Sequence, residues 1–170
     1  ASGALAVHTA CSLLESQKAE TILVVGVEKM TDVSADVIAA ALMAAADSEK
    51  DAPCGLTFPG IFGLIANRYM HEYGLTRDEL SLVSAIHHRH AVANPFAQFR
   101  KEMSIDQISN STPVADPLRL LDCSPSSDGA AACILSTKYD SPVRLAASQV
   151  SNDTLSVADR PSITSFSATR

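Results

Sequence analysis

The chain has 170 residues, of which 46% are hydrophobic, and a formal net charge of −6 at pH 7; this suffices for one sizeable core. No run of Lys or Arg exceeds two residues and no apolar stretch reaches the roughly 18 residues that span a bilayer, so neither a nucleic-acid nor a membrane partner is expected. The four cysteines show no CxxC spacing, which excludes a disulfide framework or zinc knuckle and favours a reducing compartment.

The first predicted elements are a helix and a strand. Residues 3–18 are small or apolar on most faces, which is typical of a helix buried on all sides. Residues 21–27 form a continuous apolar run rich in β-branched side chains, which is typical of a strand covered on both faces. A helix followed by such a strand is half of an α/β unit, so a layered α/β core is expected.

Residues 31–115 are predicted to form a mostly helical insertion. One helix is expected over 60–73. Its inward-facing residues are expected to be Ile61, Leu64, Ile65, Tyr69 and Met70. A capping-box pattern at Thr76–Glu79 begins a second helix, which Asn94 and Pro95 terminate. A similar pattern at Ser104–Gln107 begins a short third helix.

After the insertion the chain is expected to return to the core. Residues 124–129 are rich in Ser, Pro, Asp and Gly, and we interpret Asp128 there as a turn residue. Residues 130–135 follow as a buried strand, although Ala is a weak strand former and a short helix is the alternative. Residues 143–150 are predicted to form a further strand.

Four segments, in this order and with this spacing, resemble thiolases. They are Ala1–Ala4, Val24–Met30, Asp122–Ala132 and Ala168–Arg170. Within the family the chain resembles the archaeal and sterol-carrier-associated branch, in which Thr57–Gly60 and Asn94–Phe99 also have counterparts. The resemblance covers the whole chain but less than half of a full thiolase. It implies an internal fragment of the α/β thiolase fold, with its layered αβαβα architecture.

The resemblance also implies a division of the chain. Residues 1–31 would be the N-terminal core with the active-site helix and strand, and 32–115 the helical loop domain that covers the active site and holds coenzyme A. Residues 116–139 would be the last strand of that core, and 140–170 the start of the C-terminal core domain. No metal or redox cofactor is implied, because coenzyme A enters as a thioester substrate. A homodimer or tetramer is expected, and a partner chain is one possible source of the missing half.

Thiolases carry their nucleophilic Cys at a helix N-terminus, immediately before the Ala-Ser-Gly pattern. Free backbone N–H groups and the helix dipole lower a thiol pKa at that position. By resemblance this Cys would precede Ala1, and Ser2 and Gly3 would let an acyl-coenzyme A thioester approach closely. The chain itself carries none of the family's catalytic Cys or His residues. We therefore expect the 170 residues alone to be inactive.

Three more substrate contacts follow from the resemblance. Ser124 falls where thiolases place a Ser near the pantetheine arm of coenzyme A, and a turn Ser that caps its own backbone is an equal alternative. Phe62 and Gly63 fall where degradative thiolases often have Met-Gly beside the acyl group. Ile61 replaces the His that usually precedes this pair, so a place in the helix core is the alternative for Phe62.

Two other patterns invite a functional interpretation that we do not favour. Thr9–Ser12 resembles the nucleophile region of ketosynthases, but a thiol at Cys11 in the middle of a helix has no free N–H groups beside it. We expect Cys11 to be a small core residue. His87, His88 and His90 lack an acidic or Cys partner at ligand spacing, so a solvated helix surface is expected there rather than a metal site.

The expected function is a thiolase-type acyltransferase, either an acetyl-CoA acetyltransferase or a 3-ketoacyl-CoA thiolase. The alternative is a catalytically silent thiolase-like subunit that binds acyl-coenzyme A or scaffolds a partner. The helical insertion argues against a third hypothesis, a ketosynthase that uses acyl carrier protein. A cytoplasmic location is expected, with the peroxisomal or mitochondrial matrix as alternatives. The isolated 170 residues would leave apolar faces uncovered and are expected to be poorly soluble.

Overall fold

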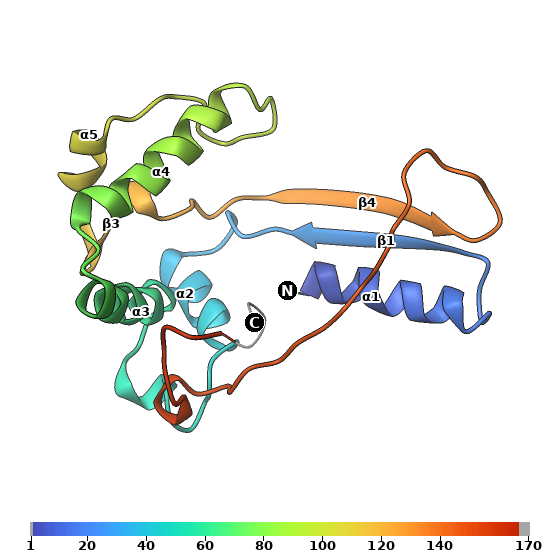
Figure 1. Ribbon diagram of the computed structural model, residues 1–170, viewed down its shortest axis with the longest axis horizontal. Coiled ribbons are helices and arrows are strands. Elements are labelled where there is room, and N and C mark those ends of the chain that lie inside the picture. The colour runs from blue at the N-terminus through green and yellow to red at the C-terminus, as the bar shows by residue number, and fades with distance from the viewer. Residues whose placement is uncertain (1, 167–170) are drawn as a thin grey trace. The chain divides into compact units, whose positions relative to one another are not determined.

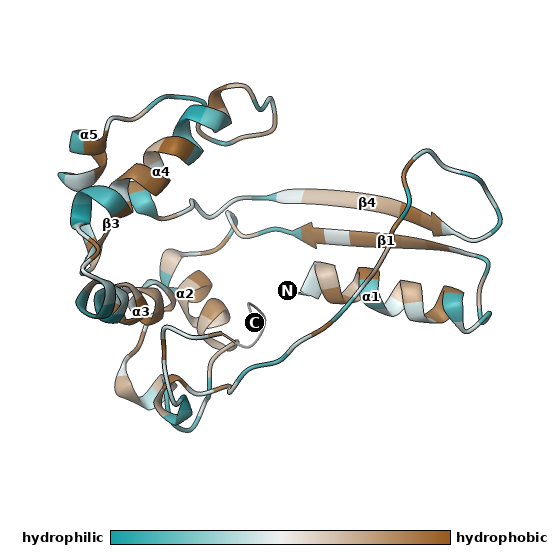
Figure 2. Ribbon diagram, viewed as in Figure 1, coloured by the Kyte–Doolittle hydropathy of each residue, from teal (hydrophilic) through white to brown (hydrophobic). Residues whose placement is uncertain are grey.

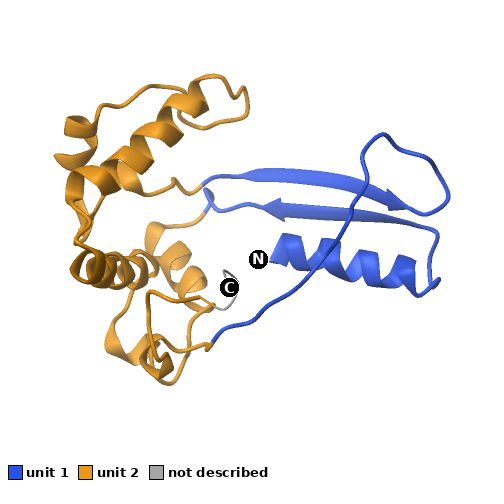
Figure 3. Ribbon diagram, in the orientation of Figure 1, with its two compact units in different colours: residues 1–32, 127–153, 167–170 blue, residues 33–126, 154–166 orange. Residues whose placement is uncertain are grey.

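The computed structural model describes residues 2–166, which form two compact units (Figure 3). Unit 1 comprises residues 2–32 and 127–153, and unit 2 comprises residues 33–126 and 154–166. The combination of helices and strands has the expected α/β character. None of the helices within 2–166 is long and apolar enough to cross a membrane.

Unit 1 is a two-stranded sheet with one helix (Figure 1). Helix α1 spans Ser2–Glu15, strand β1 spans Thr21–Glu28 and strand β4 spans Gly129–Ser136. The two strands pair antiparallel over their full lengths, and α1 packs against β1. The helix ends before the predicted limit of residue 18, where Gln17 has a left-handed backbone with φ of 57°. The helix and the two strands form where they were predicted, but the prediction that residues 130–135 are a buried strand is wrong in its burial, because β4 is exposed over most of its length.

The two faces of this sheet differ in burial. Ile22 and Val24 are half-buried. Leu23 and Val25 point to the opposite face, because side chains alternate along a strand, and they are exposed. The exposed apolar side chains of the strands are Leu23, Val25, Val27 and Ile134. Figure 2 shows the strongly apolar character of β1. The predicted cover on both faces is therefore wrong for the described residues, since unit 1 supplies a single helix.

The prediction that α1 is buried on all sides is wrong for the same reason. Ala10 and Leu14 are buried, whereas Leu5 and Leu13 on the same helix are exposed. A two-stranded sheet offers one surface for packing, so it covers one stripe of the helix and leaves the rest in contact with solvent.

The strand predicted over residues 143–150 does not form. In the described part of the chain, the sheet of unit 1 stops at two strands. A strand needs a neighbour that satisfies its backbone N–H and C=O groups, and the local sequence does not show whether one is present.

Unit 2 is mainly helical, and most of its helices begin at a residue whose side chain caps the helix. Its helices are α2 (Ala35–Met43), α3 (Phe58–Tyr73), α4 (Arg77–Val92) and α5 (Ile105–Ser109), and its strands are β2 (Pro113–Ala115) and β3 (Leu118–Arg119). Three short 3-10 turns span Ala52–Cys54, Leu120–Asp122 and Val157–Asp159. The Thr57 hydroxyl accepts a hydrogen bond from Gly60 N at 3.1 Å at the start of α3. Both predicted capping boxes are present, at Thr76 and at Ser104.

The buried side of α3 differs in part from the prediction. Ile61, Ile65 and Met70 are half-buried, but Leu64 and Tyr69 are exposed. The helix packs on β2 and β3 through its one buried residue, which is a glycine, and this contact directs Leu64 and Tyr69 away from the strands.

The C-terminal residues of unit 2 return to its helical part through polar contacts. The Ser156 hydroxyl donates to Asp51 Oδ1 at 2.9 Å, and both residues are buried. The Thr164 hydroxyl donates to Glu72 Oε2 at 2.6 Å. These contacts join segments about a hundred residues apart, so no local sequence pattern indicates them.

The capping box of α4 makes the stability of this helix dependent on pH. Glu79 Oε2 accepts hydrogen bonds from Thr76 N at 2.7 Å and from the Thr76 hydroxyl at 2.8 Å. These two bonds, the backbone bond first, lower the pKa of Glu79. The stabilisation is therefore present above the pKa of Glu79 in the unfolded chain, and it disappears as the pH falls through the lower folded-state pKa.

We expect Glu79→Gln to reduce the free energy of unfolding of the full-length protein at neutral pH. The difference from the wild type should shrink in acid, where Glu79 is protonated as well. Denaturant unfolding of both proteins across this pH range measures it. Glu102→Gln, at an exposed Glu outside the helices, is the matched control. A difference that does not change with pH would contradict the assignment.

Candidate functional site

The beginning of α1 is open. Ser2 is its first residue, and both Ser2 and Gly3 are exposed. A Cβ atom added to Gly3 would meet no atom within 4 Å. Ala1 lies outside the described residues, and so does the position before it where the nucleophile is predicted. The small residues that follow this position leave space for a ligand at the helix N-terminus.

Asp128 joins the ends of β1 and β4 in unit 1. Its Oδ1 accepts hydrogen bonds from Met30 N at 2.7 Å and Thr31 N at 3.0 Å, and its Oδ2 accepts one from the Thr31 hydroxyl at 2.6 Å. These bonds, the hydroxyl first, lower the pKa of the carboxyl group. We predicted only a turn residue here. No local pattern could identify partners that lie 97 and 98 residues earlier.

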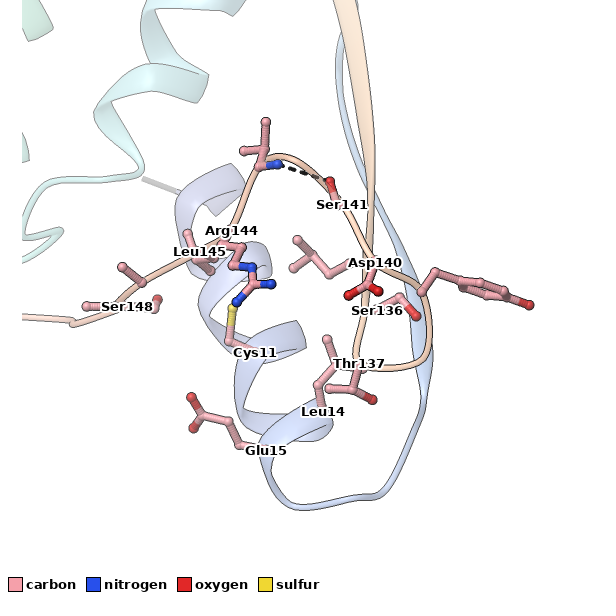
Figure 4. Close-up of a pocket in the computed structure, with 15 residues that line it drawn as sticks. Cys11, Leu14, Glu15, Ser136, Thr137, Asp140, Ser141, Arg144, Leu145 and Ser148 are labelled. Atoms are coloured by element: carbon pink, nitrogen blue, oxygen red, sulfur yellow. Dashed lines mark hydrogen bonds between the residues drawn. The ribbon is translucent and has the colours of Figure 1, made fainter.

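A cavity of about 460 Å³ lies between α1, the end of β4 and residues 137–148 (Figure 4). Figure 4 shows Cys11 and Arg144 among the residues that line it. Cys11 is half-buried and lines the cavity, so it is not the fully buried core residue that we expected. Its place within Ser2–Glu15 is nevertheless mid-helix, where backbone N–H groups bond to the preceding turn and none is free to stabilise a thiolate.

Gly63 brings α3 into close contact with β2. It is buried, and a Cβ atom at this position would lie 2.9 Å from Ala115 O and 3.1 Å from Asp116 O. These atoms belong to the backbone and cannot move aside as a flexible side chain can. The helix and the strand can therefore approach this closely only with glycine at this position.

Phe62, beside Gly63, lines a second cavity. This cavity measures about 200 Å³ and lies within unit 2. Phe62 is 49% exposed and makes an edge-to-face contact with Phe58, with 5.3 Å between the ring centroids. The apolar lining residues besides these two are Ala45, Ala46, Ile61, Ile65, Leu155, Val157, Ile163 and Phe166. Part of the cavity wall comes from residues 155–166, which no sequence pattern near Phe62 indicates.

A buried ion pair fixes the segment that precedes Ser124. The Asp122 side chain is 4% exposed and pairs with the Arg77 guanidinium group, and it accepts hydrogen bonds from Ser84 Oγ and Arg119 N at 2.8 Å each. Ser124 lies two residues later and is exposed. The structure thus places Ser124, Phe62 and Gly63 in unit 2, and Ser2 and Gly3 in unit 1.

Cys123 and His88 lie beside this ion pair and have structural surroundings. Burial, and secondly the Asp122 carboxylate, raises the pKa of the Cys123 thiol, which keeps it protonated and unreactive at neutral pH. His88 is half-buried, and its Nε2 lies 3.1 Å from Leu121 O, so one side of the ring contacts the backbone. Within residues 2–166, no three His, Cys, Asp or Glu side chains are arranged to hold a metal ion.

Comparison with known proteins identifies the family. Residues 1–139 match the thiolase N-terminal domain. The chain is 46% identical over 175 residues to acetyl-CoA acetyltransferase of Methanothermobacter thermautotrophicus, covering 99% of this chain and 45% of that protein. It is 33% identical to human sterol carrier protein 2, over 81% of this chain and 26% of that one.

A solved structure shows a similar fold. A chain of the Ltp2-ChsH2(DUF35) aldolase superimposes with a TM-score of 0.62 at 30% identity, over 80% of this chain and 35% of that chain. The chain spans less than half the length of the curated relatives that it matches. From the matched segment and these relatives, we conclude that the chain belongs to the thiolase family.

Proposed function

We propose that this chain is the internal part of a thiolase-type acyltransferase that moves acyl groups between coenzyme A thioesters. The nucleophile would be a Cys immediately before Ala1. One observation carries the proposal: α1 begins at Ser2 with small, exposed residues, inside the segment that matches the thiolase N-terminal domain. A helix N-terminus with free N–H groups stabilises a thiolate, which is the attacking species in thioester chemistry.

The proposed reaction has two steps. The thiolate attacks the carbonyl carbon of an acyl-coenzyme A, the C–S bond to coenzyme A breaks, and coenzyme A leaves as a thiol after it gains a proton. The acyl group is then bound to the enzyme through a new thioester. A second nucleophile, either the thiol of coenzyme A or a carbanion, attacks this thioester and releases the Cys thiolate.

Unit 2 supplies the groups that would hold the substrate. Phe62 lines a cavity whose wall is mostly apolar, with Asp51 and Arg160 as its charged residues, and the apolar part suits the hydrocarbon part of an acyl group. Ser124 is exposed and follows a segment that a buried ion pair holds in place, which suits a polar contact with the pantetheine arm. Ser2 and Gly3 would border the reacting thioester.

Exchange of labelled coenzyme A into unlabelled acetyl-coenzyme A tests the proposal with the full-length protein. We expect exchange without any other acceptor, because an acyl-enzyme that forms reversibly returns its acyl group to whichever coenzyme A is bound. Binding of acetyl-coenzyme A without exchange would contradict acyl transfer.

That second outcome would favour the alternative, a catalytically silent thiolase-like subunit that binds acyl-coenzyme A or scaffolds a partner. A homodimer or tetramer remains part of the main proposal, as does a cytoplasmic location with the peroxisomal or mitochondrial matrix as alternatives. Both the main proposal and the alternative are compatible with a partner chain that supplies the missing half.

A further inference from the structure

The C-terminal segment of unit 2, residues 154–166, forms one wall of the cavity that Phe62 lines. We call this segment the strap, and Figure 1 shows it in red beside the residues that follow α2. The strap residues that line the cavity are Leu155, Val157, Arg160, Ile163 and Phe166. The strap belongs to no sheet and no α-helix, so its position depends on the contacts that individual residues make with the helical part of unit 2.

A buried hydrogen bond between Ser156 and Asp51 holds the strap to the helical part. Ser156 Oγ donates to Asp51 Oδ1 at 2.9 Å, and the two residues are 1% and 3% exposed. Val157 N donates to the other carboxylate oxygen of Asp51 at 3.3 Å, and Ala158 N donates to Ser156 Oγ at 3.2 Å. Hydrogen bonds to a carboxylate are stronger than bonds between neutral groups. Asp51 therefore fixes the strap at the point where it first meets the cavity.

Two further contacts of the strap lie nearer to solvent. The Thr164 hydroxyl donates to Glu72 Oε2 at 2.6 Å. Lys50 forms an ion pair with Asp159, and the side chains of this pair are 52% and 45% exposed. Exposed ion pairs contribute little to stability, because water screens the charges. Of these contacts, the Ser156–Asp51 bond is the one that water cannot replace.

The cavity has the size and the lining to hold a small uncharged apolar ligand. Its volume is about 200 Å³, and a cavity of about 150 Å³ lined by Leu, Ile and Phe is large enough for benzene. The charged residues of its wall, Asp51 and Arg160, already have partners within the strap. The Arg160 guanidinium group lies 4.6 Å from the centroid of the Phe166 ring and donates to Ser165 O at 3.0 Å. The rest of the wall is apolar.

We propose that the strap closes a binding site for a small uncharged apolar ligand within unit 2, and that the Ser156–Asp51 bond keeps the site closed. All of these groups belong to unit 2, so the inference goes beyond the proposed function and holds whether or not the protein transfers acyl groups. Leu155 and Val157 flank Ser156, so loss of the bond frees the side chains that they contribute to the wall. The ligand must then order the strap when it binds, which lowers its affinity.

Benzene is the probe, and methyl NMR of the full-length protein locates it. In the wild type we expect benzene to shift the methyl resonances of Ile61, Ile65 and Ile163, which line the cavity, and the shifts to saturate as benzene is added. The methyl resonances of Leu82 and Val83, which are exposed on α4, are the internal reference and should not move.

Two variants locate the ligand and test the strap. Ala46→Leu places a larger side chain in the cavity wall and should abolish the benzene shifts. Ser156→Ala removes the buried hydroxyl donor, and we expect the benzene Kd to rise about five- to ten-fold. Hydrogen exchange of the Val157 and Ala158 amides should rise by a similar factor, about five- to ten-fold.

Lys50→Ala is the matched control for Ser156→Ala. It breaks the exposed ion pair between the strap and the same part of unit 2, so it should resemble the wild type in both measurements. Thr164→Val removes the hydroxyl that bonds to Glu72, and it gives a milder version of the effect if Ser156→Ala does not fold.

Each outcome decides for or against the proposal. Saturable cavity shifts in the wild type, with weaker binding and faster exchange in Ser156→Ala, support it. A wild type without saturable shifts, or shifts that persist in Ala46→Leu, overturns the binding site. Faster exchange with an unchanged Kd in Ser156→Ala overturns the closing role of the strap. None of these measurements uses acyl transfer, so a failure of the proposed function is detected separately, by the exchange of coenzyme A.

Discussion

Asp122→Ala is expected to lower the free energy of unfolding of the full-length protein by about 3–5 kcal/mol, because it leaves a buried charge without its partner. The Asp122 side chain is 4% exposed and pairs with Arg77, whose guanidinium group also donates to Pro117 O at 3.0 Å. Asp122 holds three donors from α4 and β3 together. Denaturant unfolding followed by far-UV circular dichroism measures the change.

A second ion pair on the neighbouring helix provides a matched control. Arg68 pairs with Glu72 one turn along α3, and its side chain is 54% exposed. Exposed pairs at this spacing contribute about 0.3–0.5 kcal/mol. Arg77→Ala should therefore destabilise the protein several times more than Arg68→Ala. Equal effects of the two substitutions would show that the Arg77–Asp122 pair does not hold the segment before Ser124.

Replacement of the residue before Ala1 by Ala is expected to abolish acyl transfer. If that residue is the nucleophilic Cys, its loss removes the covalent step, and the rate should fall by about four orders of magnitude or more. Binding of acyl-coenzyme A should persist, because the substitution leaves the groups of unit 2 in place. Coenzyme A exchange, quenched at timed intervals, measures the rate of acyl transfer. Calorimetry measures the binding of acyl-coenzyme A.

Cys11→Ser is the control for this experiment. Cys11 lies in the middle of α1 and lines a cavity in unit 1, so it should not contribute to the transfer rate. The account would fail if Cys11→Ser lost activity while the variant before Ala1 retained it.

The sequence predicted those elements whose signals are local. The capping boxes at Thr76 and Ser104 and the apolar run of β1 each depend on a few adjacent residues, and all three were confirmed. The resemblance to thiolases rested on four ordered segments and was likewise confirmed. The division into four domains and the substrate contacts of Ser2, Gly3, Phe62, Gly63 and Ser124 stay predictions.

Predictions from the sequence were wrong or missing where the structure depends on residues far away along the chain. Residues 143–150 were predicted to form a strand, but no neighbouring strand pairs with them within residues 2–166. The bonds of Asp128 and Ser156 join residues about a hundred positions apart, so nothing in their local sequence indicates them. Burial of β1 was overestimated for a related reason: composition shows that a strand is apolar, but not what covers it.

Mapping of the acyl group tests the central claim most directly. The full-length protein is incubated with acetyl-coenzyme A, quenched in acid and digested, and the modified peptide is sequenced by mass spectrometry. The account predicts one acetyl group, on the sulfur of a Cys that immediately precedes Ala1. An acetyl group on Cys11 or Cys123, or a residue other than Cys before Ala1, would contradict it.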